Sequence, residues 1–269
     1  MTTIITSNFN KLSSNVTSKF NSIIESDSIV SKIIKATLVI IVLTIIFKSI
    51  EYGINRAKDF KARTPYLLKG TKDAKIATVI TQNPKDEESI TLKLSDNQQN
   101  GLEFSYMFWI NIDDYTYKQK EWKHVFHKGT QDGYPLRAPG VWLHPNNNIM
   151  RVYMNTLNNI NEFIDIKNIP INKWFCVTIS CKQKKLDIYI NGNLAIGKTL
   201  SGIPRQNYGN VYINNFGGFS GNISNLRYFN YYISYSELRT YLNQGPAMIE
   251  MDYNNSLPPY LDSKWWTRS

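Results

Sequence analysis

Cysteine is nearly absent from this chain of 269 residues, which holds Cys176 and Cys181 and no other. Both fall in one predicted strand, residues 174–181, where five residues of extended chain separate their Cα atoms by about 16 Å. A disulfide requires Cα atoms within about 7 Å of each other, so these two thiols cannot pair. The sequence therefore excludes an internal disulfide and fits a reducing compartment.

Carboxylates at catalytic spacing are also missing. A retaining glycosidase holds two carboxyl groups about 5 Å apart across the scissile bond. No predicted strand carries alternating acidic residues, and Glu162 and Asp165 are three positions apart, which predicts opposite faces of a strand. We therefore expect no glycosidase activity, and no enzyme.

Histidine is scarce and occurs as His124, His127 and His144. His124 and His127 are three positions apart in one predicted strand, so we expect their side chains on opposite faces. No cysteine or carboxylate completes a zinc-type set around them. The sequence predicts no resident metal and no other cofactor. A calcium ion held by loop carbonyls and Asp132 or Asp165 stays open, because such ligands leave little trace in a sequence.

One long apolar run is present, and it extends from Ile33 to Ile50. Between Lys35 and Lys48 it has no charged residue, and it reaches the roughly 18–20 residues of a membrane span when both lysines snorkel to the interfaces. A buried core helix fits less well, because such a helix need not be apolar all round with basic residues at both ends. We predict a single transmembrane helix that begins at Ile33 and ends at Ile50. The alternative is a helix that lies in the plane of the membrane as an anchor.

The formal net charge is +10, and half of the excess lies just after the apolar run. This position favours anionic lipid head groups over nucleic acid, so we expect a lipid bilayer as a partner and no nucleic acid. The N-terminal side of the run carries Lys32 and Lys35 with Glu25 and Asp27 nearby, so the positive-inside rule places the C-terminal part on the cytosolic side. The sequons at Asn222 and Asn254 should then stay unglycosylated. The basic residues after the run are Lys48, Arg56, Lys58, Lys61, Arg63, Lys69, Lys72 and Lys75, against Glu51, Asp59 and Asp73.

The residues on either side of the predicted span differ in character. Residues 1–32 are polar with apolar residues at roughly helical spacing, which fits either an amphipathic helix on a membrane or a weakly ordered tail. Residues 51–100 are typical of a basic stalk that contains a modest β-like run at residues 74–80, and in which residues 89–94 could form the first edge strand of the following domain. The predicted segments are thus 1–32, the span 33–50, the stalk 51–100, a β domain 101–245 and a tail 246–269.

The β domain is organised around a meander at residues 173–198. Three short runs rich in β-branched and aromatic residues are separated there by polar turn residues, and Asn191-Gly192 tolerates the positive φ angles of a tight hairpin. About ten such runs follow one another from residue 102 onward. Helix is indicated only at residues 234–243, where Ser234 and Glu237 form a capping box. The sequence predicts an all-β fold, an antiparallel sandwich or jelly roll.

The order of these runs resembles a known family. Its motifs here are Trp122-x-x-x-Phe-x-Lys-Gly, Gly140-Val-Trp-Leu, Tyr189-Ile-Asn-Gly, Phe219-x-Gly-x-Ile and Leu226-Arg-Tyr-Phe-Asn. Together and in this order they resemble the laminin G-like branch of the concanavalin A-like lectin/glucanase superfamily. The resemblance implies two antiparallel sheets in a jelly roll and no particular activity. One departure is Ser224-Asn225, where many members carry an acidic residue.

A glycan site would need aromatic platforms beside polar side chains. Tyr134, Arg137, Trp142 and Asn146 lie in or beside the longest loop within the predicted domain and are the candidates for glycan contact, although Trp142 also fits a core position.

The tail combines Pro258-Pro259 with Tyr260, Trp265, Trp266 and Arg268, which we take as candidates for partner docking. Packing on its own domain is one interpretation of this segment, and contact with a partner protein or the membrane interface is the other.

The sequence thus favours a non-enzymatic, membrane-anchored structural or adaptor protein with protein partners. Its single N-terminal span, its composition rich in Ile, Lys and Asn, and its tail make it similar to proteins of large DNA viruses, which implies a minor capsid-associated component in an internal virion membrane. A membrane-displayed module that binds glycans is the alternative.

Overall fold

The computed structural model describes residues 28–86, 88–95 and 102–247. The chain divides into two compact units, Met1–Phe60 and Lys61–Ser269, and each is described by itself. The tail residues Tyr260, Trp265, Trp266 and Arg268 lie outside the described residues.

Helix α2 (Ile29–Arg63) contains the apolar run and is long and apolar enough to cross a membrane, by length and composition alone. The side chains of the run are exposed, so it does not form a core helix in the described structure. The predicted ends Ile33 and Ile50 both lie inside the helix. The helix continues past Ile50 through the basic residues and ends at Arg63. It ends close to Pro65 because a proline disfavours a helical conformation at the residue before it.

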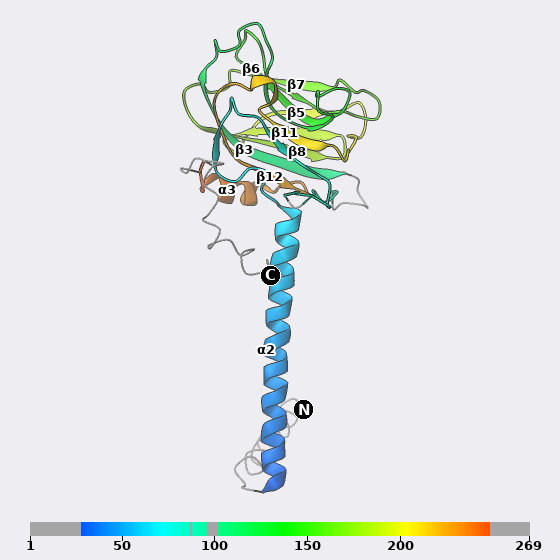
Figure 1. Cartoon of the computed structure of the whole chain (residues 1–269). Coiled ribbons are helices and arrows are strands. Elements are labelled where there is room, and N and C mark those ends of the chain that lie inside the picture. The colour runs from blue at the N-terminus through cyan, green and yellow to red at the C-terminus, as the bar shows by residue number, and fades with distance from the viewer. Residues whose placement is uncertain (1–27, 87, 96–101, 248–269) are drawn as a thin grey trace, which may run out of the picture. The chain divides into compact units, whose positions relative to one another are not determined.

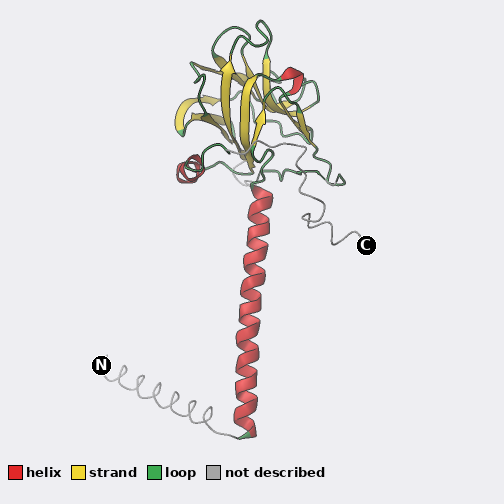
Figure 2. Cartoon of the chain, turned by 60° about the vertical axis from the view of Figure 1, so that its left-hand side comes forward, coloured by secondary structure: helices red, strands yellow, loops and turns green. Residues whose placement is uncertain are grey.

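The unit from Lys61 onward is a sandwich of two six-stranded sheets in which every paired strand is antiparallel, as Figures 1 and 2 show. This confirms the fold class predicted from the sequence. Sheet A contains, in spatial order, β1 (Thr71–Asp73), β12 (Ser220–Phe229), β3 (Glu103–Asp114), β8 (Phe175–Lys182), β9 (Lys185–Ile190) and β10 (Asn193–Thr199). Sheet B contains β2 (Thr78–Ile80), β11 (Asn210–Ile213), β4 (Lys123–Gly129), β5 (Arg137–Leu143), β6 (Ile149–Tyr153) and β7 (Phe163–Lys167).

The predicted meander is β8, β9 and β10. Asn191 and Gly192 join β9 to β10 with φ angles of 48° and 78°, as a two-residue hairpin turn requires. The two cysteines are free and buried. Cys181 packs in the core between the sheets, whereas Cys176 packs on the outer face of sheet A, so the predicted lack of pairing is confirmed.

The sandwich begins earlier than the predicted boundary at residue 101. Strand β1 pairs with β12 and β2 pairs with β11, so residues assigned to the stalk belong to the sheets. Leu67, Leu68 and Ala74 lie in the core. Residues 89–94 form no strand, although Ile90 and Leu92 pack against the core. Strand β2 lies within the β-like run at residues 74–80, whereas β1 has only three residues, too few to show a two-residue period, and the sequence did not reveal it.

The outer faces of the two sheets differ. Helix α3 (Tyr235–Leu242) covers sheet A through a cluster that includes Met107, Phe229 and Leu238. The hydroxyl of Ser234 accepts a hydrogen bond from the N–H of Glu237, which confirms the Ser234 half of the predicted capping box, while the Glu237 carboxylate accepts from the hydroxyl of Tyr231. Sheet B has no such helix on its outer face in the described part of this unit, so that face is available to carry a site.

Candidate functional site

A row of polar and aromatic side chains crosses the outer face of sheet B. His124 on β4 lies opposite Trp142 on β5, Trp142 lies opposite Arg151 on β6, and Arg151 lies opposite Asp165 on β7. Residues directly opposite each other in an antiparallel sheet share one face. The neighbours of these residues along the strands, such as Val141 and Val152, lie in the core. We call this the outer row.

Arg151 is held rigidly in the outer row. Its Nε and Nη2 donate to the two carboxylate oxygens of Asp165, over 2.6 and 2.7 Å. The guanidinium carbon also lies 3.8 Å from the ring centroid of Phe163 and 4.8 Å from that of Trp122. The hydrogen bonds to Asp165 raise the pKa of Arg151 above its ordinary value. A bidentate, stacked guanidinium loses little further freedom when it contacts a partner.

A second arginine approaches the same face from the start of β5. The guanidinium carbon of Arg137 lies 3.6 Å from the ring centroid of Tyr153 and 5.4 Å from that of Trp142. Its Nη2 donates to Oδ1 of Asn161 over 2.8 Å. Its Nε is buried and has no hydrogen-bond partner in the described part of the chain. Burial lowers the pKa of this guanidinium.

Trp142 forms a supporting layer beneath the exposed side chains. It is 7% exposed, yet it lies on the outer face and not in the core between the sheets. Its ring covers Gly140, where an added Cβ would lie 2.4 Å from its Cζ3 atom. The ring of His127 stacks on it at 5.6 Å, and Tyr212 stacks on His127 at 5.0 Å. Trp142 therefore positions its neighbours and offers little surface to a ligand.

The four glycan candidates do not form one cluster. Arg137 and Trp142 are in contact, and Tyr134, which is 56% exposed, belongs to the loop before Arg137. Asn146 follows the opposite end of β5, about 20 Å along the strand. Its Oδ1 there accepts a hydrogen bond from the backbone N–H of Lys120.

The sequence reasoning missed the partners of Arg137, namely Tyr153 and Asn161, and the whole Arg151 cluster. These residues are far apart in the sequence and are brought together by the register of strands β5, β6 and β7. A cross-strand row becomes visible only when the pairing of β4 to β7 is known.

The prediction that His124 and His127 lie on opposite faces is wrong. A register shift between His124 and Phe126 inserts a bulge in β4, and both imidazoles then lie on the outer face. Their ring nitrogens Nε2 of His124 and Nδ1 of His127 are 2.7 Å apart. The outer ends of this pair bind backbone: Asn215 N–H donates to His124 Nδ1, and His127 Nε2 lies 2.7 Å from the carbonyl oxygen of Thr130.

Metal-binding groups do not gather on this face or elsewhere in the described ranges. Among residues 28–86, 88–95 and 102–247, no three His, Cys, Asp or Glu side chains are placed to hold one metal ion.

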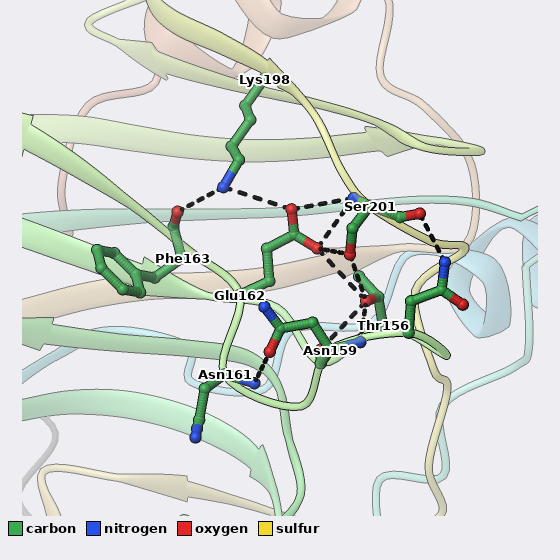
Figure 3. A network of polar contacts seen from close by, with 8 residues as sticks. Thr156, Asn159, Asn161, Glu162, Phe163, Lys198 and Ser201 are labelled. Atoms are coloured by element: carbon green, nitrogen blue, oxygen red, sulfur yellow. Dashed lines mark hydrogen bonds and ion pairs between the residues drawn. The ribbon is translucent and has the colours of Figure 1, made fainter.

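The carboxylate of Glu162 joins the two sheets at another place, as Figure 3 shows. It accepts hydrogen bonds from the backbone N–H of Ser201 at 3.0 Å and from the Ser201 hydroxyl at 2.7 Å. Lys198 on β10 of sheet A lies 3.4 Å from it and also donates to the carbonyl oxygen of Phe163 on β7 of sheet B. Burial, which alone would raise the pKa of Glu162, is outweighed by these hydrogen bonds, which lower it.

Glu162 and Asp165 thus have separate partners. The first binds Ser201 and Lys198, and the second binds Arg151. The Glu162 carboxylate also accepts a hydrogen bond from the hydroxyl of Thr156 over 3.3 Å. These contacts join the segment between β6 and β7 to β10 and the residues that follow it, which is the contact pattern of a structural clamp.

Comparison with known proteins identifies the family. A family model described as the concanavalin A-like lectin/glucanases superfamily matches residues 86–239, more than half of the chain. No curated protein matches the sequence.

Solved structures with a similar fold include receptor-binding domains of botulinum neurotoxins. That of the C/D mosaic serotype is 15% identical, with 53% of this chain and 36% of that chain covered and a TM-score of 0.43. That of type G is 18% identical, with 56% and 41% covered and a TM-score of 0.42. This chain spans less than half the length of those chains, and the likeness concerns the fold alone.

Proposed function

We propose that this chain, which belongs to the concanavalin A-like lectin/glucanases superfamily, is a non-enzymatic, membrane-anchored adaptor. In this proposal helix α2 holds the protein in a lipid bilayer, and the outer row of sheet B contacts a protein partner. The domain lies on the cytosolic side. The location in an internal virion membrane is part of the proposal and rests on the sequence pattern alone.

The anchoring rests on the composition of helix α2. Its apolar stretch from Ile33 to Ile50 covers about 27 Å as a helix, close to the thickness of a bilayer core. The helix then continues with basic side chains to Arg63. Each lysine or arginine near an anionic membrane surface contributes about 1 kcal/mol to binding.

The partner contact rests on one observation, the fixed arginines and the exposed aromatic side chains that lie on the outer face of sheet B with the outer row. Trp122 is 36% exposed and Phe163 is 39% exposed, and the guanidinium of Arg151 lies over both rings. Tryptophan, tyrosine and arginine are the residues that most often dominate protein interfaces. Because these side chains are already ordered, a partner that covers them incurs little conformational entropy loss.

A glycan ligand remains the second candidate because of Arg137 and Tyr134. Tyr134 offers an exposed ring beside an arginine whose Nε lacks a partner among the described residues. The buried position of Trp142 weakens this candidate, since a sugar would stack on an exposed ring.

Photo-crosslinking of the full chain in membranes of producing cells tests the adaptor function. The crosslinking amino acid p-benzoylphenylalanine replaces Phe163, which contacts Arg151 of the outer row, or, as the control, Ile196, which is exposed on β10 of sheet A. We expect one discrete protein adduct from position 163 that disappears in the Arg151→Ala background, and none from position 196. Equal adducts at both positions, or saturable binding to a glycan array that requires Tyr134, would contradict the adaptor function.

A further inference from the structure

A lysine points into the sandwich at one end of β4. Lys128 follows His127, whose ring lies on the outer face, so its own side chain lies on the core side. It is 8% exposed, and its Nζ donates to the carbonyl oxygen of Gly209 over 2.6 Å. No carboxylate pairs with it in the described ranges. An ammonium carries three donors, and this contact uses one of them.

Lys128 lines a pocket between the two sheets. The pocket lies at the ends of β3, β4, β5 and β12 and has a volume of about 50 Å³. Its walls are largely apolar and aromatic, with Leu92, Phe104, Tyr106 and Tyr228 among them, and the exposed Tyr208 lies at its rim.

A second polar group in this wall has an unused donor. Tyr106 is buried and lines the pocket, and its hydroxyl makes no hydrogen bond to any residue that the structure describes. The neighbouring Tyr228 differs, because its hydroxyl donates to the carbonyl oxygen of Lys93 over 2.8 Å. The Tyr106 hydroxyl and the remaining donors of the Lys128 ammonium therefore both offer hydrogen bonds that no described residue accepts, in the lining of one pocket.

We propose that this pocket binds the carboxylate end of a short aliphatic acid, with Lys128 and Tyr106 donating hydrogen bonds to the carboxylate oxygens. The two groups offer donors, so the ligand must supply acceptors, and the ammonium favours a negative charge.

The size and lining of the pocket restrict the ligand further. One water-sized group needs about 10–15 Å³ of such space, so the pocket accommodates roughly four non-hydrogen atoms, which is a carboxylate with its first carbon. The aromatic walls suit the apolar remainder of a short chain that leaves past Tyr208. A phosphate dianion fits worse, because it would bring more charge into an apolar site with few donors. This site is independent of the adaptor function proposed for the outer row.

Ligand-observed NMR on the full chain in nanodiscs tests the proposal with butyrate as the probe and n-butanol as its uncharged control. We expect saturable binding of butyrate at pH 7 and at least tenfold weaker binding of n-butanol. Lys128→Met should weaken butyrate binding at least tenfold and Tyr106→Phe about threefold or more. The matched control Lys184→Met removes an exposed lysine and should leave butyrate binding unchanged.

Lys128→Met and Tyr106→Phe each replace a side chain by an uncharged one of similar size. Thermal unfolding midpoints equal to that of the wild type verify that the variants fold. Butyrate binding that is equal in the wild type and in both pocket variants would overturn the proposal. Equal binding of butyrate and n-butanol would also overturn it, because the site would then recognise only apolar surface.

The pH dependence provides a readout that needs no variant. Burial lowers the pKa of Lys128 to about 8. The other titratable groups lining the pocket are Lys93 and the phenols of Tyr106, Tyr208 and Tyr228, and burial raises the pKa of Tyr106 and Tyr228. Butyrate binding should therefore fall as the pH rises through about 8. Constant affinity from pH 7 to pH 9.5 would contradict a role for Lys128.

Discussion

The imidazole of His124 donates from Nε2 to Nδ1 of His127, over 2.7 Å. The direction follows from the backbone partners. The N–H of Asn215 donates to His124 Nδ1, so that nitrogen is unprotonated and the proton of His124 is on Nε2. The proton of His127 is then on its Nε2, which faces the carbonyl oxygen of Thr130. All four ring nitrogens are satisfied only when both rings are neutral.

This pair makes the sandwich sensitive to acid. Burial lowers the pKa of His127 to about 4, and burial together with His127 lowers that of His124 well below its ordinary value. Since the folded pKa is depressed, the stabilisation is complete above the unfolded pKa of about 6.5 and is lost as the pH falls toward 4. The loss from His127 alone is on the order of 3 kcal/mol. Urea unfolding at pH 7.5 and pH 4.5 measures it.

The matched variant is His127→Gln, whose amide stays uncharged at both pH values. It should show a much smaller difference in unfolding free energy between pH 7.5 and pH 4.5. If the wild type and the variant lost equal stability on acidification, the neutral pair would not be the cause.

The ion pair of Arg151 and Asp165 should show measurable coupling. Its bidentate geometry and partial burial predict a coupling free energy of about 1–2 kcal/mol in a double-mutant cycle with Arg151→Ala and Asp165→Ala. The pair of Lys118 and Glu121, in which the glutamate side chain is 64% exposed, is the control, and we expect less than about 0.5 kcal/mol for it. Equal coupling in the two pairs would show that the arginine is not held as described.

Gly140 should tolerate a methyl group only when the ring above it is removed. Gly140→Ala brings a Cβ to 2.4 Å from Trp142 Cζ3, so we expect a loss of about 1–3 kcal/mol in unfolding free energy. In a Trp142→Leu background the same change should cost less than about 0.5 kcal/mol. A cost that does not depend on residue 142 would contradict the close contact between ring and backbone.

Glu162 should contribute strongly to the closure of the sandwich. Glu162→Ala leaves the Ser201 N–H and hydroxyl without their acceptor, and we expect a loss of about 2–3 kcal/mol. Because the pKa of Glu162 is lowered, its contribution is present above about pH 4.3 and is lost below it. Glu121→Ala, on an exposed turn, is the control and should change little. Hydrogen exchange of the Ser201 amide reports the local effect, and unchanged protection in Glu162→Ala would refute the clamp.

The sequence predicted the sandwich because its strands are long enough to show a two-residue period. The meander around Asn191-Gly192 and the cap at Ser234 were confirmed for the same reason, since each depends on neighbours in the sequence. The short strand β1 could not be predicted, because its three residues acquire their conformation from pairing with β12, whereas β2 lies within the β-like run predicted at residues 74–80.

The candidate site was predictable only in part. Arg137 and Trp142 were identified from residue type, but their contacts with each other and with Tyr153 depend on register. The bulge after His124 reverses the face expected for one histidine, and nothing in the local sequence marks it. Lys128 was overlooked because a lysine in an alternating strand is normally assigned to the solvent face.

The central claim is a sandwich held on the cytosolic side of a membrane by one helix. Protease protection of the full chain in sealed microsomes tests this most directly, with an antibody against the sandwich as the detector. The account predicts that externally added protease digests the domain and that Asn222 and Asn254 remain unglycosylated. A protected domain with a mass shift that is removed by a glycosidase would place it in the lumen and contradict the account.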